Sequence, residues 1–313
     1  MNNLAFVFPG QGSQAVGMLD DLYVSYPQIQ HQFARASDVL SLDLMEMITD
    51  DPHNQLNLTE YTQPALLTAS VAIWHLWKEN SHIRPTYMAG HSLGEYSALV
   101  CAGAIEFEDA VLLTHKRGQY MQQAVPTGTG SMAAVLGLSD EQVIEICQDA
   151  DAAGNVSAAN FNSPGQVVIS GSKVAVEKAS ELAKEAGAKR VMPLPVSVPS
   201  HCQLMMPAAE KLAEDLATID IKSPSIPVIH NVDVLAHISP EKIRQSLIEQ
   251  LYKSVNWTQT NQFFMDKNIS NIIECGPNKV LSGLAKRTNR KWNINSLNTT
   301  IGFDKALTLG SEE

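Results

Sequence analysis

Cysteine is scarce in this sequence and shows no pairing pattern. The chain has four cysteines in 313 residues, and no two of them form a C-x-x-C pair. This count and spacing argue against the disulfide framework of a small secreted domain and against a structural zinc site. We therefore expect reduced thiols, no bound metal and a cytoplasmic protein. The four are Cys101, Cys147, Cys202 and Cys275.

Positive charge is also in short supply, and no long hydrophobic run is present. Lys and Arg number 22 against 33 Asp and Glu, which gives a formal net charge of −11. That balance argues against a nucleic-acid-binding protein. The apolar run Leu4–Phe8 is too short for a membrane span or a signal sequence, and no basic segment precedes it. We expect neither nucleic acid nor a membrane among the partners of this chain.

The sequence does contain a serine flanked by glycines between a strand pattern and a helix pattern. Residues 90–94 read G-H-S-L-G, with an extended run, Pro85–Ala89, before them and a helix-compatible run, Glu95–Ala102, after them. This arrangement predicts a nucleophile elbow, because a tight turn that exposes the Ser92 hydroxyl needs neighbours without a Cβ. The turn also directs the backbone N–H of Leu93 at an oxyanion formed there. The alternative is a glycine turn with an incidental serine.

A second glycine-rich segment imitates a dinucleotide-binding loop. Residues 10–15 match G-x-G-x-x-A and follow the expected strand Leu4–Phe8. A dinucleotide-binding unit would place a second strand, ending in an acidic residue, about 20 residues further on. The segment Ile29–Asp38 has a helical pattern instead. We reject NAD binding and interpret the glycines as a tight loop that carries Gln11 near Ser92.

Alternating strand and helix patterns predict an α/β fold with an inserted small domain. After a linker at residues 125–130, the pattern reads strand, helix, strand, strand, helix, strand, which is the ferredoxin-like order. The remainder alternates strands and helices, which predicts a parallel-sheet larger domain. We predict residues 1–127 and 197–313 as the larger catalytic domain and residues 128–196 as the insertion.

The expected elements can be stated by residue range. Those of the insertion are Met132–Leu138, a helix from the Ser139 capping box to Ala150, Val156–Asn160, Gln166–Ser170, Ser172–Ala186 and Arg190–Val196. Those of the larger domain are Leu4–Phe8, Thr62–Lys78 entered through Pro64, Glu106–Gln123, Met205–Leu216, Ile226–Asn231, Pro240–Leu251 and Asn271–Glu274.

A serine nucleophile needs a base, and nine histidines are available. The turn should point His91 away from the Ser92 hydroxyl. We favour His201 over His230, because His201 follows Pro199-Ser200 at the junction of the two predicted domains, where clefts usually form. No aspartate is evident as the third member of a triad.

One arginine lies on a helix face whose other residues are apolar or small. Arg117 shares this face with Phe107, Ala110, Thr114 and Met121 at helical spacing. A guanidinium there must meet an anion, because an unpaired buried charge is costly. Two interpretations stay open: an internal salt bridge with Asp or Glu, or a planar set of donors that awaits a substrate carboxylate.

Five sequence blocks, in order, closely resemble the malonyl-CoA:acyl-carrier-protein transacylase family of fatty-acid synthesis. The resemblance runs from about Leu4 to Leu284 and implies a hydrolase-like larger domain with a ferredoxin-like insertion. The residue between Glu274 and Gly276 departs from the expected pattern, because Cys275 stands where a small apolar residue is expected. The blocks are FPGQGSQ at 8–14, GHSLGE at 90–95, NFNSPGQ at 160–166, VSVPSH at 196–201 and ECGP at 274–277.

The resemblance implies roles for individual residues. Ser92 matches the acylated nucleophile, His201 its general base and Arg117 the arginine that binds the malonyl carboxylate. Gln11 matches the residue whose backbone N–H joins that of Leu93 in the oxyanion hole. Two further positions complete the set implied: Gln250, whose main-chain carbonyl orients the histidine, and Asn160, which lines the cleft from the small domain.

The resemblance also implies the reaction and its partners. It predicts ping-pong transfer of a malonyl group from malonyl-CoA to the phosphopantetheine thiol of acyl carrier protein, by a monomer without a cofactor other than the coenzyme A thioester substrate. Two rivals remain. A serine esterase or thioesterase would use Ser92 and His201 but has no need of Arg117. A non-enzymatic acyl-CoA sensor would bind the ligand without forming an acyl-enzyme.

Overall fold

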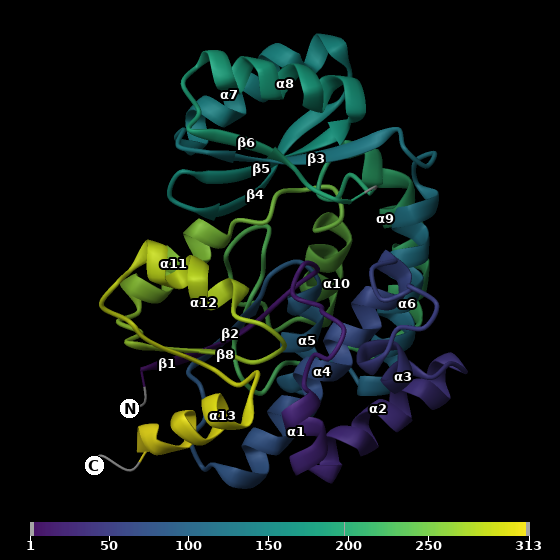
Figure 1. Cartoon of the computed structure of the whole chain (residues 1–313), viewed down its shortest axis with the longest axis vertical. Coiled ribbons are helices and arrows are strands. Elements are labelled where there is room, and N and C mark those ends of the chain that lie inside the picture. The colour runs from purple at the N-terminus through teal and green to yellow at the C-terminus, as the bar shows by residue number, and fades with distance from the viewer. Residues whose placement is uncertain (1–2, 197, 311–313) are drawn as a thin grey trace.

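The described part of the chain, residues 3–196 and 198–310 of a computed structural model, contains two β-sheets (Figure 1). The larger sheet has the strand order β7-β2-β1-β8-β9, and each pair of adjacent strands in it is parallel. Its central strand β1 is buried along its whole length, as expected for a continuous apolar run in a parallel sheet. The strands are β1 (Leu4–Phe8), β2 (Tyr87–Gly90), β7 (Val228–Ile229), β8 (Asn271–Glu274) and β9 (Asn293–Ser296).

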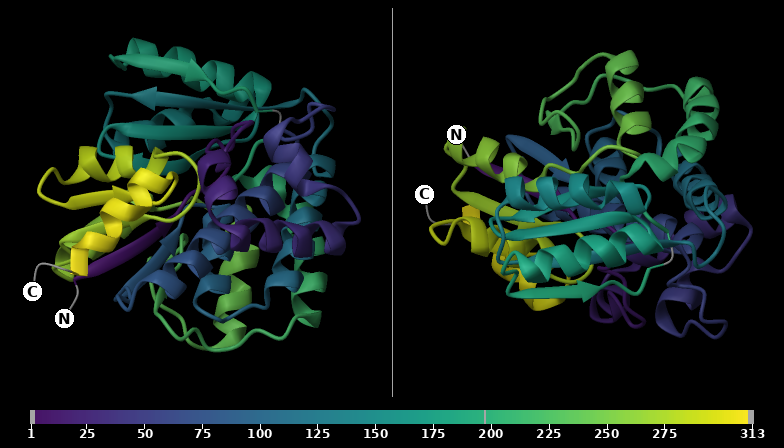
Figure 2. Two further views of the ribbon diagram at one scale, coloured as in Figure 1. Left: turned by 60° about the horizontal axis from the view of Figure 1, so that its bottom comes forward. Right: turned by 90° about the horizontal axis from the view of Figure 1, so that it is seen from above.

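Helices cover both faces of the larger sheet (Figures 1 and 2). On one face Phe6 makes edge contacts with Trp74 and Trp77, with ring centroids 5.3 and 5.4 Å apart. On the other face Val7 shares a core with Phe264. The helices are α1 (Asp20–Ser25), α2 (Pro27–Leu40), α3 (Leu44–Thr49), α4 (Thr59–Asn80), α5 (Leu93–Cys101), α6 (Phe107–Gln123), α9 (Met206–Thr218), α10 (Pro240–Glu249), α11 (Trp257–Asp266), α12 (Val280–Thr288) and α13 (Thr300–Leu307).

Helix α4 begins before the proline that was expected to open it. It starts at Thr59, so Pro64 lies inside the helix. A proline there leaves the carbonyl four residues earlier without its usual donor. The Glu60 carbonyl oxygen instead lies 2.9 Å from His115 Nδ1 on helix α6. The close approach depends on Gly118, since a Cβ there would lie 2.4 Å from the Glu60 Cα. Tertiary contacts thus compensate for the interruption.

The smaller sheet has the strand order β4-β5-β3-β6 and is antiparallel, which is the ferredoxin-like arrangement. Helices α7 and α8 cover the face that points away from the larger domain (Figure 2). The capping box predicted at Ser139 is present, with Gln142 as its partner. The elements are β3 (Gly130–Leu136), α7 (Asp140–Ala150), β4 (Val156–Ser163), β5 (Gln166–Ser172), α8 (Lys173–Glu185) and β6 (Arg190–Pro193).

The largest differences from expectation within the insertion are at the ends of β4 and β6. The segment 161–165 was expected to be a loop, but strand pairing continues to Ser163 and only Pro164 and Gly165 form the turn. Strand β6 ends at Pro193 rather than at Val196. The domain limits themselves, 1–127 with 197–313 and 128–196, remain a prediction, and Ser197 lies outside the described residues.

Backbone hydrogen bonds attach the small sheet to the larger domain. Val255 donates its N–H to the Ala159 carbonyl at 2.9 Å, and Phe161 donates to the Val255 carbonyl at 3.0 Å. Asn160, between them on β4, forms a parallel bridge with Val255. The face of the small sheet that α7 and α8 leave uncovered is therefore fixed over the carboxyl ends of the larger sheet's strands.

None of the helices in the described part of the chain has both the length and the apolar character that a membrane span requires.

Candidate active site

Ser92 lies in the tight turn between β2 and α5. Its backbone has a φ of 51° and a ψ of −110°, a strained conformation for a residue with a side chain. A Cβ on Gly90 would lie 1.8 Å from the Gly94 carbonyl carbon, and a Cβ on Gly94 would lie 2.0 Å from the Phe8 carbonyl oxygen. Glycine is therefore required on both sides of Ser92, and the turn has the geometry of a nucleophile elbow.

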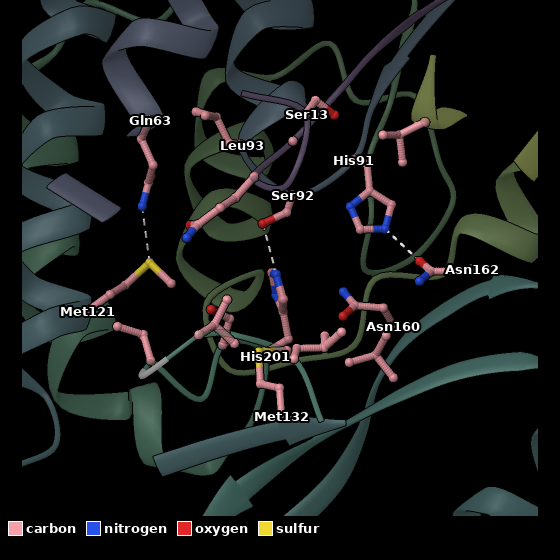
Figure 3. A pocket seen from close by; sticks show the side chains of 18 of the residues that line it. Ser13, Gln63, His91, Ser92, Leu93, Met121, Met132, Asn160, Asn162 and His201 are labelled. Carbon is pink, nitrogen blue, oxygen red and sulfur yellow. Dashed lines mark hydrogen bonds between the residues drawn. The ribbon is translucent and has the colours of Figure 1, made fainter. Parts of the chain in front are cut away.

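His201 lies beside the serine hydroxyl, and its other ring nitrogen meets a backbone carbonyl. Ser92 Oγ and His201 Nε2 are 2.8 Å apart (Figure 3). His201 Nδ1 lies 2.7 Å from the main-chain carbonyl oxygen of Gln250. Because a carbonyl only accepts, Nδ1 carries the ring proton and Nε2 presents its lone pair to the hydroxyl. The orienting group is thus a carbonyl, where a triad would have a carboxylate.

Protonation of His201 is strongly disfavoured. Burial and the neighbouring Arg117 lower the pKa of His201 to about 3. The imidazole is therefore neutral near pH 7 and able to accept a proton. His230, the alternative base, is fully buried and its Nδ1 lies 2.7 Å from Glu95 Oε1. That second histidine contacts a carboxylate below the elbow rather than the hydroxyl.

Arg117 reaches the same point from helix α6. Its side chain is only 1% exposed, and its NH2 lies 3.4 Å from Ser92 Oγ. NH1 donates to Gln63 Oε1 at 2.6 Å, and NH2 donates to Gln250 Oε1 at 3.0 Å. Within the described residues no carboxylate forms an ion pair with this guanidinium, so the internal salt bridge considered from the sequence is not found. Two uncharged amide oxygens hold a buried cation beside the serine.

The other predicted residues also line the cavity around Ser92. Leu93 is the first residue of α5, where backbone N–H groups have no partner within the helix. Gln11 lies in the loop after β1, and its Nε2 donates to Thr59 Oγ1 at 3.2 Å. The loop packs tightly on the elbow, since a Cβ on Gly10 would lie 2.4 Å from the His91 carbonyl oxygen. Asn160 is buried and enters the cavity from β4.

The cavity lies between the two sheets, and much of its remaining wall is apolar. The small domain contributes Met132 and Val168, and helix α12 contributes Leu281 and Leu284. These side chains give the space beside Ser92 an apolar wall that favours uncharged groups. Among residues 3–196 and 198–310, no group of three His, Cys, Asp or Glu side chains is arranged to hold a metal ion.

Several residues in the site were not found from the sequence. Asn231 Oδ1 accepts from the Ser92 N–H at 2.7 Å, and Asn231 Nδ2 donates to the Gly90 carbonyl at 2.6 Å. Gln63 holds Arg117, as described above. His91 lines the cavity, and its Nε2 lies 2.8 Å from Asn162 Oδ1 on β4 (Figure 3). No local pattern marks these residues, because their partners lie between 54 and 141 positions away.

Comparison with known proteins places this geometry in a family. The model of the acyl transferase domain family matches residues 5–304. The malonyl CoA-acyl carrier protein transacylase of Escherichia coli (strain K12) is 52% identical over 309 residues, which cover 99% of this chain and 100% of the relative. The Coxiella burnetii malonyl CoA-acyl carrier protein transacylase structure has a TM-score of 0.96 at 49% identity, covering 98% of this chain and 97% of that one.

A further solved structure bears on the site's partners. It is a malonyl-transacylase in complex with a type II PKS acyl-carrier protein, with a TM-score of 0.96 at 50% identity, covering 98% of this chain and 99% of that one. A serine at a nucleophile elbow, a neutral histidine and a buried arginine agree with the chemistry that such names describe. The chain is an acyltransferase and belongs, within the acyl transferase domain family, to the malonyl-CoA:acyl-carrier-protein transacylases.

Proposed function

We propose that this enzyme moves a malonyl group from coenzyme A to the phosphopantetheine thiol of an acyl carrier protein, by a ping-pong mechanism, and so supplies fatty-acid synthesis. One observation carries the proposal: a buried guanidinium held by uncharged oxygens lies 3.4 Å from a serine hydroxyl that contacts a neutral histidine. The names of full-length relatives support both substrates. Because Ser92, His201 and Arg117 meet within one chain, the proposed mechanism needs no residue from a second copy, and we propose that the enzyme acts as a monomer.

In the first half-reaction the malonyl group moves to Ser92. His201 Nε2 takes the hydroxyl proton as Ser92 Oγ attacks the thioester carbonyl carbon. The N–H groups of Leu93 and Gln11 stabilise the oxyanion. When the tetrahedral intermediate collapses, the carbon–sulfur bond breaks, and the imidazolium returns its proton to the departing coenzyme A thiolate. The product is a malonyl-serine ester, and no cofactor takes part beyond the thioester substrate.

In the second half-reaction the carrier's thiol replaces coenzyme A. His201 accepts the thiol proton as sulfur attacks the ester carbonyl, and the same N–H groups stabilise the oxyanion. Collapse breaks the bond to Ser92 Oγ, which recovers its proton from His201. Throughout, Arg117 binds the malonyl carboxylate and fixes the acyl group in one pose. Asn160 contacts the acyl group from the small-domain side of the cavity.

Replacing Arg117 tests the substrate assignment. Loss of two charge-assisted hydrogen bonds to the malonyl carboxylate costs about 1.5–3 kcal/mol per bond. We expect Arg117→Ala to slow acylation of Ser92 by malonyl-CoA by at least about 10²-fold. Acylation by acetyl-CoA should rise, because acetyl has no carboxylate for a buried cation to bind. The measurement is single-turnover formation of each acyl-enzyme, followed by intact mass.

Arg117→Lys is the matched variant for this test. It keeps the positive charge but loses the planar pair of donors, so malonyl transfer should recover only in part. An equal fall with malonyl-CoA and acetyl-CoA in Arg117→Ala would contradict the proposal, because it would make Arg117 a purely structural cation. A wild-type malonyl-enzyme that passes its acyl group to water rather than to a carrier thiol would favour a thioesterase instead.

In the pH–rate profile of Ser92 acylation, the fall on the acid side should lie at unusually low pH. Only neutral His201 accepts a proton, so the rate falls as the pH drops through its pKa, which is about 3. With acetyl-CoA, which carries no titrating acyl group, we expect a rate that stays level from neutral pH down to about 4. Arg117→Ala removes a cation that lowers the pKa of His201. The acid side of this variant's pH–rate profile should therefore move to higher pH. Rapid-mixing pH profiles of both proteins check the shift, and coincident profiles on the acid side would contradict it.

A further inference from the structure

The Gln250 side chain connects Arg117 to a carboxylate that does not touch it. Gln250 is fully buried at the end of α10, and its Oε1 accepts from Arg117 NH2 at 3.0 Å. Its Nε2 donates to Glu95 Oε2 at 2.9 Å and to the Ser92 carbonyl oxygen at 3.0 Å. The guanidinium, the amide and the carboxylate thus form one hydrogen-bonded series beneath the serine.

The partners of this amide allow only one orientation. Glu95 Oε2 and the Ser92 carbonyl can only accept, whereas the guanidinium can only donate. Turned over, the amide would place its oxygen against two oxygens and its NH2 group against the guanidinium. Each such buried mismatch costs more than the hydrogen bond it replaces. The acceptors beside Nε2 therefore determine which Gln250 atom faces Arg117.

Glu95 is itself held firmly, three residues after the nucleophile in the first turn of α5. It is fully buried. Oε1 lies 2.7 Å from His230 Nδ1, and Oε2 accepts from the Asn231 N–H at 2.9 Å in addition to Gln250. With donors on both oxygens, this carboxylate stays in place instead of turning toward the guanidinium.

A neutral amide between the two charges has a chemical consequence. A carboxylate in direct contact would form a bidentate pair with Arg117 and occupy the donors that a substrate carboxylate needs. The two oxygens that do hold the guanidinium, from Gln63 and Gln250, carry no charge, and its central carbon lies 5.4 Å from the centre of the Tyr96 ring. Arg117 is thus positioned while its charge stays available to the cavity.

We propose that Glu95 is a positioning residue for acyl selectivity: as a hydrogen-bond acceptor it fixes the Gln250 amide, which in turn orients Arg117 toward carboxylated acyl groups. This inference rests on the proposed function. The main chain of Gln250 places His201 independently, through its carbonyl. The side chain of Gln250 therefore governs selectivity, and its backbone governs the base.

The readout is the ratio of Ser92 acylation rates with malonyl-CoA and acetyl-CoA, measured in single turnovers of the full chain. Glu95→Met keeps an unbranched side chain of similar length but offers Gln250 no strong acceptor. We expect the ratio to fall about tenfold, which corresponds to one weakened charge-assisted contact. A merely structural role would lower both rates together and leave the ratio unchanged.

Glu95→Gln is the conservative rescue. Its oxygen can take the place of Oε2, and its NH2 can donate to His230 Nδ1 when the histidine proton moves to Nε2. That nitrogen has no partner among the described side chains, so the shift breaks no hydrogen bond. We expect the ratio to stay within about threefold of wild type. A ratio as low as that of Glu95→Met, in a protein that melts normally, would overturn the acceptor role.

Gln250→Met completes a double-mutant cycle and touches none of Glu95's other bonds. It should lower the ratio about tenfold by itself, and adding Glu95→Met should lower it no further, because the two residues act in series. If the two effects multiply in the double variant, the inference is overturned. An unchanged ratio in Gln250→Met would also overturn it, even if Glu95→Met did not fold. Wild-type protein is assayed first: failure to form a malonyl-enzyme would reject the proposed function, whereas a normal wild type with unresponsive variants rejects only this inference.

Discussion

Ser92→Ala is expected to fold like the wild type and to gain no malonyl group from malonyl-CoA. The hydroxyl faces the cavity and contacts only His201 and Arg117 among the described residues, so its removal leaves little packing to lose. Alanine keeps the Cβ, and the left-handed backbone at φ 51° is as strained with alanine as with serine. Intact mass after incubation and thermal unfolding measure the two parts of this prediction.

Ser13→Ala provides the matched control for this loss. Ser13 is a buried serine that lines the same cavity, and we expect its variant to form the malonyl adduct normally. A malonyl adduct on Ser92→Ala would place the nucleophile elsewhere. Wild-type protein that binds malonyl-CoA without any adduct would indicate an acyl-CoA sensor.

The second large effect is expected at His201. Replacing His201 by alanine removes the imidazole that we propose takes the Ser92 proton, and a positioned general base is worth about 10²–10⁴-fold. Unlike Arg117→Ala, this variant should slow malonyl-CoA and acetyl-CoA by similar factors, since both acyl groups need the same proton transfer. Single-turnover acylation with each thioester is the measurement.

His230→Asn is the control for the histidine. The Asn amide can replace the ring Nδ1 as a donor to Glu95, so the hydrogen bonds below the elbow persist while an imidazole is lost. We expect acylation near the wild-type rate. Near-normal acylation in His201→Ala together with a large loss in His230→Asn would reverse the assignment of the base.

Local signals predicted much of the fold. The five-residue apolar run gives β1, and the capping box at Ser139 marks the start of α7. The helix expected over Thr62–Lys78, with Pro64 in its first turn, begins earlier, at Thr59. Local sequence does not reveal the contact with His115 that satisfies the Glu60 carbonyl and lets Pro64 lie inside the helix. The loop expected at 161–165 was wrong because β4 keeps pairing with β5 as far as Ser163 and Gln166, through register shifts that no local pattern announces.

In the candidate site, too, some residues are marked by their local sequence and others are not. Ser92 stands out because its turn is encoded by its immediate neighbours, and Arg117 stands out because a cation interrupts an apolar helix face. Gln63, Asn231 and the contact between Glu95 and Gln250 have no such local signature. They are ordinary polar residues whose meaning comes only from burial and from partners that folding brings together.

The place of β1 at the centre of the larger sheet has a consequence for how the chain matures during synthesis. Leu4 pairs with Asn271, so one edge of this apolar strand stays open until most of the chain has left the ribosome. The small sheet pairs only within Gly130–Pro193 and can complete itself earlier. The surroundings of Ser92 are likewise incomplete until Gln250 has been synthesised, because Gln250 contacts both His201 and Arg117. A nascent chain that ends before Asn271 therefore exposes an apolar strand edge, and one that ends before Gln250 also lacks the residue that contacts both His201 and Arg117.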